Sequence, residues 1–113
     1  LKKNCEDSKE KILNRINRIK KEGKRICGYA ATSKSTTILN YCKIDTSSID
    51  YICDTTPEKI KKFSPGMHIP IVDMEYFHNN QPDSIYLFGW NHKDEIFKKE
   101  KNFNGEWFSH VEL

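Results

Sequence analysis

Hydroxyl and ammonium side chains gather in one short stretch of the sequence, directly after an apolar run. The stretch supplies six polar side chains in succession: Thr32, Ser33, Lys34, Ser35, Thr36 and Thr37. Such groups donate hydrogen bonds to phosphate or carboxylate oxygens. The chemistry that this stretch supports is therefore the binding of an anion.

The elements that must position these side chains are a strand before them and a helix behind them. Ile26 to Tyr29 forms a short apolar run, and the helix-spaced set Ile38, Leu39 and Tyr41 follows the turn. In an open parallel sheet such a turn lies at the carboxyl end of the strand. The first N–H groups of the next helix then point at whatever binds there.

The glycine content of this turn leaves its role open. Gly28 is present, but Ala30 and Ser35 stand where a dinucleotide fingerprint would have further glycines. No Gly-Lys-Ser or Gly-Lys-Thr phosphate loop occurs in the sequence. A plain strand-to-helix turn with a Ser/Thr cap is therefore the alternative to an anion site.

Length and composition predict one globular domain. The chain has 113 residues, of which 36% are hydrophobic and 31% charged, which excludes collagen-like and disordered classes. No apolar run approaches the ~20 residues that cross a bilayer, and no charged-then-apolar leader opens the chain. We therefore expect a cytoplasmic location and no membrane partner. Because the first residue is Leu rather than Met, we expect the chain to be part of a longer protein.

The cysteines and the net charge predict neither a metal site nor a nucleic-acid partner. The cysteines are too widely spaced for a metal knuckle and have no histidine at ligand spacing, so we expect reduced thiols: Cys5, Cys27, Cys42 and Cys53. The net charge is +3, with many Lys and Arg residues before residue 26. Acidic residues are interspersed there and no aromatic residue precedes Tyr29, which favours a solvated helix face over a nucleic-acid surface.

Apolar periodicity divides the rest of the chain into alternating helices and strands. Residues 6 to 22 predict an amphipathic helix that ends at Gly23, and Asp73 and Asn91 are expected to cap two later helices, which end near Asn80 and Lys101. The further strands are expected at 49–53, 69–72, 84–88 and 106–110. This alternation predicts an α/β three-layer sandwich with a mostly parallel sheet of about five strands in the order 3-2-1-4-5, preceded by an extra amphipathic helix.

That strand order brings two distant loops together. The first and fourth strands are neighbours whose outgoing helices lie on opposite faces, and such a switch point is where open α/β sheets bind ligands. The loops 30–35 and 89–91 would meet there, with Trp90 over a base or sugar ring and Asn91 bonded to a hydroxyl. Asp54 ends the second strand and either contacts a ribose hydroxyl or forms a turn. His68 is either a ligand contact or a solvated loop residue.

Several motifs, taken in order over residues 10 to 100, resemble the C-terminal domain of the sugar C-methyltransferases that act on nucleotide-linked deoxysugars. The matching motifs are Gly28-Tyr29-x-Ala31-x-x-Lys34, Thr37-x-Leu39-Asn40-Tyr41-Cys42-x-Ile44-Asp45, Ile49-Asp50-Tyr51 with Asp54, Pro65-Gly66-x-His68-Ile69-Pro70-Ile71, and Trp90-Asn91-x-x-Asp94-Glu95-Ile96. The sequence departs from that family at Ala30 and Ser35, where the family commonly has glycine, and at Gly89, where it often has proline.

The resemblance implies a single Rossmann-like domain, residues 1–113, that holds a nucleotide-sugar within a longer methyltransferase. Zinc and S-adenosylmethionine would be bound by upstream domains of the same protein, with no cofactor, metal or catalytic residue in this chain. The candidate substrate-binding residues are Lys34, Ser35, Asp54, His68, Trp90 and Asn91. The alternatives are a stand-alone module that binds another nucleotide or coenzyme A, and a nucleic-acid interaction domain.

Overall fold

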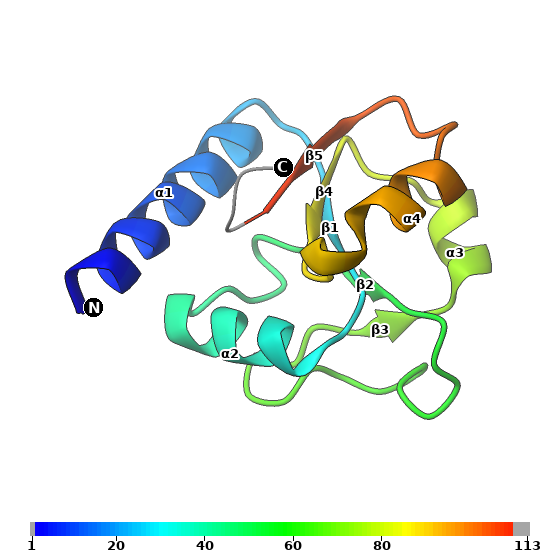
Figure 1. The fold of residues 1–113 in the computed structure, drawn as a ribbon, viewed down its shortest axis with the longest axis horizontal. Coiled ribbons are helices and arrows are strands. Elements are labelled where there is room, and N and C mark those ends of the chain that lie inside the picture. The colour runs from blue at the N-terminus through cyan, green and yellow to red at the C-terminus, as the bar shows by residue number, and fades with distance from the viewer. Residues whose placement is uncertain (1, 110–113) are drawn as a thin grey trace.

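A computed structural model describes residues 2–109, in which helices and strands mostly alternate, as Figure 1 shows. The exception is β3, which follows β2 with no helix between them. The side chains of a few helical residues, Cys5 and Lys34 among them, lie outside the described part. In chain order the elements are α1 (Lys2–Lys21), β1 (Ile26–Tyr29), α2 (Ser33–Cys42), β2 (Ile52–Cys53), β3 (Ile71–Val72), α3 (Met74–Asn79), β4 (Ser84–Leu87), the 3₁₀ turn η1 (Trp90–His92), α4 (Lys93–Lys99) and β5 (Glu106–Phe108).

The five strands form one parallel sheet in the order β3-β2-β1-β4-β5, which confirms the predicted topology. β1 lies at the centre, with Tyr29 opposite Cys53 of β2 on one side and opposite Leu87 of β4 on the other. Every residue of β1 and β4 is buried, as expected for strands covered on both faces.

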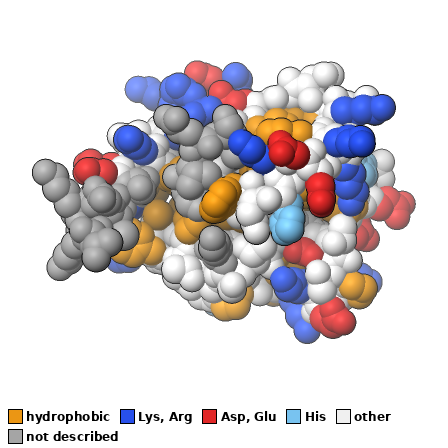
Figure 2. Space-filling model, viewed as in Figure 1, with side chains coloured by type: hydrophobic (Ala, Val, Ile, Leu, Met, Phe, Trp, Pro, Cys, Tyr) orange, Lys and Arg blue, Asp and Glu red, His pale blue; other side chains and the backbone are white. Residues whose placement is uncertain are grey.

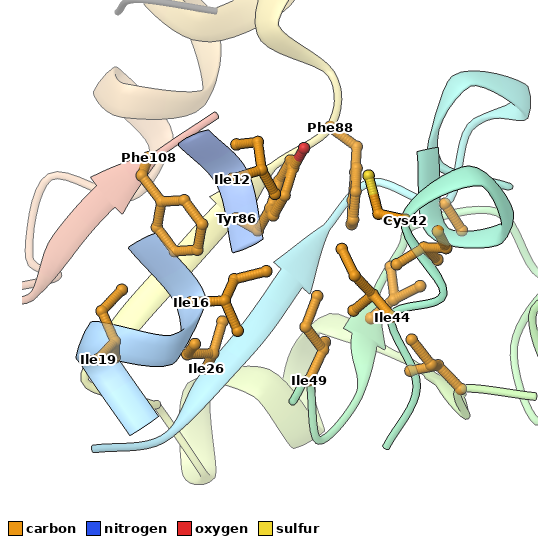
Figure 3. Packing of buried hydrophobic residues seen from close by; sticks show 14 of the residues in the cluster. Ile12, Ile16, Ile19, Ile26, Cys42, Ile44, Ile49, Tyr86, Phe88 and Phe108 are labelled. Carbon is orange, nitrogen blue, oxygen red and sulfur yellow. The ribbon is translucent and has the colours of Figure 1, made fainter. Parts of the chain in front are cut away.

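The two faces of the sheet carry separate apolar clusters, because successive strand side chains point to opposite sides. On one face, α1 and α2 pack through Ile12, Ile16 and Leu39 against strand residues such as Ile26 and Tyr86, as the close-up in Figure 3 shows for the α1 side chains. The other face carries the second cluster, with Cys27, Tyr29, Phe77, Ile85, Leu87, Ile96 and Trp107 among its members. α3 and α4 therefore cover the face opposite to α1 and α2 (Figure 1).

Gly23 ends α1 as predicted. Its φ of 76° is in the left-handed region, where glycine has no steric penalty. Gly23 N–H donates to Lys20 O at 2.9 Å and Lys24 N–H donates to Ile19 O at 3.2 Å, the paired bonds of a Schellman motif. α1 is also tied to the edge strand β5, because Arg15 lies 3.0 Å from the Glu106 carboxylate.

Charged side chains of both signs are spread over the visible face of the molecule. Figure 2 shows Lys and Arg interspersed with Asp and Glu, rather than gathered into one basic patch on that face. Among residues 2–109, no helix is both long and apolar enough to cross a membrane. Three cysteines, Cys27, Cys42 and Cys53, are buried free thiols.

Several local boundaries differ from the predictions; β3, for example, is shorter than 69–72. β2 is shorter than 49–53, although Asp50 N–H still donates to Ile26 O at 2.9 Å. The predicted Asn91 cap is wrong: His92 N–H bonds to Gly89 O at 2.9 Å, which closes a 3₁₀ turn and delays α4 until Lys93. Asp73, by contrast, caps α3 by accepting from Tyr76 N–H at 2.8 Å, as predicted. The last residue of the expected strand 106–110 lies outside the described residues.

Candidate functional site at the carboxyl edge of the sheet

The loops that follow β1 and β4 meet at the carboxyl edge of the sheet. Tyr29 and Leu87 are paired in parallel register, so the two strands end side by side. A Cβ atom placed on Gly89 would lie only 3.4 Å from Ala30 Cβ and 3.9 Å from Ile96 Cδ1. The β1 and β4 exits therefore touch, while their helices lie on opposite faces, which is the geometry of a switch point.

The turn after β1 has an unusual backbone conformation that side chains from elsewhere hold in place. Ala30 has a φ of 76°, a region that favours glycine and costs other L-residues roughly 1–2 kcal/mol. Asp54 Oδ2 accepts the Ala31 N–H at 2.6 Å, and Lys59 Nζ donates to Ala31 O at 2.6 Å. Both backbone groups of Ala31 are thereby fixed by residues that follow β2.

The Asp54 carboxylate is fully engaged in this turn. Its second oxygen, Oδ1, accepts the Thr56 N–H at 2.8 Å, and the residue is 8% exposed. Asp54 thus has the turn-forming role that the sequence left open beside the ribose contact. Its carboxylate joins the β1 exit to the β2 exit.

The α2 amino end continues from this turn. Thr32 caps the helix, with its Oγ1 accepting the Ser35 N–H at 3.1 Å, and the Ser35 hydroxyl donates back to Thr32 O at 2.6 Å. Ser35 is 1% exposed, so its hydroxyl forms part of the cap. Lys34 is the second residue of α2 and so lies in its first turn, although its side chain is outside the described part.

Trp90 and Asn91 lie on the other side of the meeting point. Both belong to η1, directly after the buried strand β4; Trp90 is half-buried and Asn91 is exposed. The structure therefore brings the amino end of α2, Asp54 and the Trp90-Asn91 pair to the same edge of the sheet, as the strand order predicted.

His68 lies away from the carboxyl edge of the sheet, where the other candidate residues meet. It precedes β3, in a loop where a Cβ placed on Gly66 would collide with the Asn40 side chain at the end of α2. Since α2 starts at the carboxyl edge and runs back across the sheet, its last turn marks the amino edge. The structure does not bring His68 to the other candidates, and its ligand contact stays a prediction.

A pocket of about 220 Å³ opens beside the meeting loops, on the face covered by α3 and α4. Its buried or half-buried lining residues are Tyr29, Ala30, Cys53, Asp54, Met74 and Ile96, and its exposed ones are Thr55, Glu95 and Lys99. An apolar recess with a few polar groups is the usual form of a small-molecule site.

Burial keeps two polar side chains of this pocket, Tyr29 and Cys53, in their neutral forms. Burial, and then the hydrogen bond to Glu100, raises the pKa of Tyr29, so its hydroxyl keeps its proton. Burial is also the main cause that raises the pKa of Cys53, which favours the thiol over the thiolate. Two of the buried side chains that line the pocket, Tyr29 and Cys53, are therefore neutral, and the acidic and basic residues of its lining are Asp54, Glu95 and Lys99.

A larger hollow, of about 750 Å³, lies at the opposite edge, between the end of α1 and the starts of β4 and β5. Its lining includes Arg18, Lys24, Asp83 and Glu106. We assign the site to the smaller pocket because parallel sheets bind ligands at the carboxyl ends of their strands, where helix amino ends converge.

Sequence reasoning missed several residues of this site. Lys59 gave no signal, because it contacts Ala31 from a distance of 28 positions along the chain. Met74 and Lys99 lie within predicted helices, and nothing in the sequence indicates that they line a site. Glu95 and Ile96 had a signal, since both belong to the last motif of the resemblance.

The whole chain also matches known proteins. Residues 1–111 match the family described as the C-methyltransferase C-terminal domain. The chain belongs to this family. It is also 37% identical over 82 residues to the C-methyltransferase NovU of Streptomyces niveus; the match covers 73% of this chain and 20% of that protein. The chain thus spans about a fifth of the length of this relative.

The first βα turn has a left-handed residue at Ala30, where the resemblance leads us to expect glycine. Within residues 2–109, no group of three or more His, Cys, Asp and Glu side chains is arranged to hold a metal ion.

Proposed function

We propose that this chain is the substrate-binding C-terminal domain of a C-methyltransferase that acts on a nucleotide-diphosphate keto-deoxysugar. The observation that carries the proposal is the meeting of the β1 and β4 exits beside the 220 Å³ pocket. Membership of the C-methyltransferase C-terminal domain family supports the class of reaction, the transfer of a methyl group to carbon.

The proposed roles follow from the chemistry of each group. The first N–H groups of α2 and the Lys34 ammonium would hold the diphosphate, because a helix amino end carries partial positive charge. The recess lined by Tyr29, Met74 and Ile96 has room for one flat ring or sugar. Trp90 would cover a ring from the β4 side, and Asn91 would bond a hydroxyl.

The parts of the reaction outside this chain belong to the proposal too. A base would remove a proton beside the keto group of the sugar, and the resulting carbanion would take the methyl group. S-adenosylmethionine, held by an upstream domain, would supply that methyl from its sulfonium. Zinc would likewise be bound upstream, and this chain alone would be inactive.

Calorimetric titration of the chain with thymidine diphosphate glucose tests the proposal. We expect saturable binding that Lys34→Ala weakens about tenfold or more, since a charge-assisted bond contributes about 1.5–3 kcal/mol. Lys11→Ala, which removes an exposed lysine of α1, is the charge-matched control and should leave the affinity unchanged. Equal losses in both variants would contradict the proposal, because they would indicate unspecific attraction. Binding of coenzyme A with no binding of the sugar nucleotide would favour the stand-alone module.

A further inference from the structure

A buried carboxylate lies next to the pocket and has no part in the proposed ligand contacts. Glu100 directly follows α4 and is 5% exposed, although glutamates are almost never fully buried without partners. Tyr29 OH donates to Glu100 Oε2 at 2.8 Å, and His78 Nε2 lies 2.8 Å from Oε1. Each carboxylate oxygen therefore has a polar partner, and each partner comes from a different element.

These elements are the ones that wall the pocket. Tyr29 is itself part of the lining at the end of β1; α3 contributes Met74 to the lining and carries His78 one turn later. α4 contributes Glu95, Ile96 and Lys99 and ends next to Glu100. A single carboxylate thus connects the strand and both helices around the recess.

We propose that Glu100 is a positioning residue, which sets the spacing of β1, α3 and α4, and with it the shape of the pocket, through Tyr29 and His78. The inference concerns the pocket itself. The part of its test that measures ligand affinity rests on the proposed function.

The geometry allows the Tyr29 hydroxyl little freedom. The ring packs edge-on against Phe77, with centroids 5.6 Å apart, and in a tilted arrangement against Trp107, with centroids 5.8 Å apart. Because Tyr29 keeps its proton, its hydroxyl donates to Oε2 of Glu100. His78 completes the cluster from α3, with 48% of its side chain exposed.

Tyr51 provides a matched control. It is 3% exposed and belongs to the same apolar cluster as Tyr29. Its hydroxyl also reaches the end of α3, where it donates at 2.6 Å to O of Asn80, the residue that follows the helix. Tyr51 does not line the pocket and does not contact Glu100 in the described structure. Tyr29→Phe and Tyr51→Phe therefore each remove one buried hydroxyl, and only the first disconnects the carboxylate from β1.

The test needs no ligand in its first step. Methyl NMR spectra of the chain report on Met74 and Ile96 in the pocket wall and on Ile16 on the opposite face. We expect Tyr29→Phe to move the Met74 and Ile96 methyl signals and to leave Ile16 in place, whereas Tyr51→Phe leaves Ile96 in place. Glu100→Gln, which still offers Tyr29 an acceptor, should give smaller shifts than Glu100→Ala. If Glu100→Ala does not fold, the methyl spectrum of Tyr29→Phe alone tests the inference.

The second step measures affinity with thymidine diphosphate as the probe. Tyr29→Phe should weaken its binding about threefold to tenfold, because the altered pocket wall loses contacts to the ligand of about the strength of one hydrogen bond, and Tyr51→Phe should not. A Tyr29→Phe variant that is less stable but keeps wild-type methyl shifts and affinity would overturn the inference, because Glu100 would then be merely structural. If the wild-type chain does not bind the probe, the proposed function fails, and the methyl shifts still decide the inference.

Discussion

Replacing Asp54 by Asn should destabilise the chain well beyond the effect of an ordinary surface substitution. The carboxylate accepts the Ala31 N–H at 2.6 Å and the Thr56 N–H at 2.8 Å, at a position only 8% exposed. An amide of the same shape has one acceptor oxygen, so its NH₂ group would face one of the two backbone donors. One charge-assisted bond is lost, about 1.5–3 kcal/mol, and one N–H is left without a partner. We therefore expect the free energy of unfolding to fall by about 2–3 kcal/mol at neutral pH.

Urea denaturation followed by circular dichroism measures this loss as a shift of the midpoint at constant slope. Asp73→Asn is the matched control, because Asn caps a helix about as well as Asp and the Tyr76 N–H keeps its acceptor. The control should stay within about 0.5 kcal/mol of the wild type. An Asp54→Asn variant that is as stable as the control would refute the reasoning, since the carboxylate would then not hold the turn.

Two further predictions concern the sheet and its tyrosines. Gly28→Ala should lower the free energy of unfolding by about 1–3 kcal/mol in the same denaturation assay, because the new Cβ would lie 2.6 Å from the buried Phe88 ring. Gly89→Ala is the control and should cost far less, since its new Cβ would meet its neighbours at 3.4 and 3.9 Å. Equal losses of stability in the two variants would contradict this packing. Alkaline titration followed by tyrosine absorbance should show late ionisation of the residues whose pKa burial raises: Tyr29, Tyr51 and Tyr86. Because an unfolded tyrosine ionises near pH ~10, their contribution to stability is intact below that pH and is lost as the pH rises above it. Ionisation of all three before the circular dichroism signal changes would disprove their burial.

The strand order could be predicted because local patterns of apolar residues indicate where the strands and helices lie. The apolar runs at β1 and β4 are buried on both faces, and the helices α2 and α3 lie between them in the chain. Once that order was set, the meeting of Ala30 with Gly89 followed from topology, without any knowledge of side-chain contacts.

The supports of the site could not be predicted in the same way. Tyr29 and Glu100 are 71 positions apart, and no local pattern connects them. The missing cap at Asn91 has a physical cause as well: the bond from His92 N–H to Gly89 O forms a tight turn before the helix, which no propensity of Asn91 could reveal. The left-handed backbone of Ala30 was also not predicted, because alanine rarely adopts a positive φ and its residue type gives no sign of one.

The most direct test of the central claim is a titration with thymidine diphosphate glucose, followed by backbone amide chemical shifts residue by residue. The account predicts that the amides of Ala31, Lys34, Gly89 and Asn91 shift together with one dissociation constant, because they belong to one site. Shifts confined to the opposite edge, around Lys24 and Gly105 of the larger hollow, would contradict it.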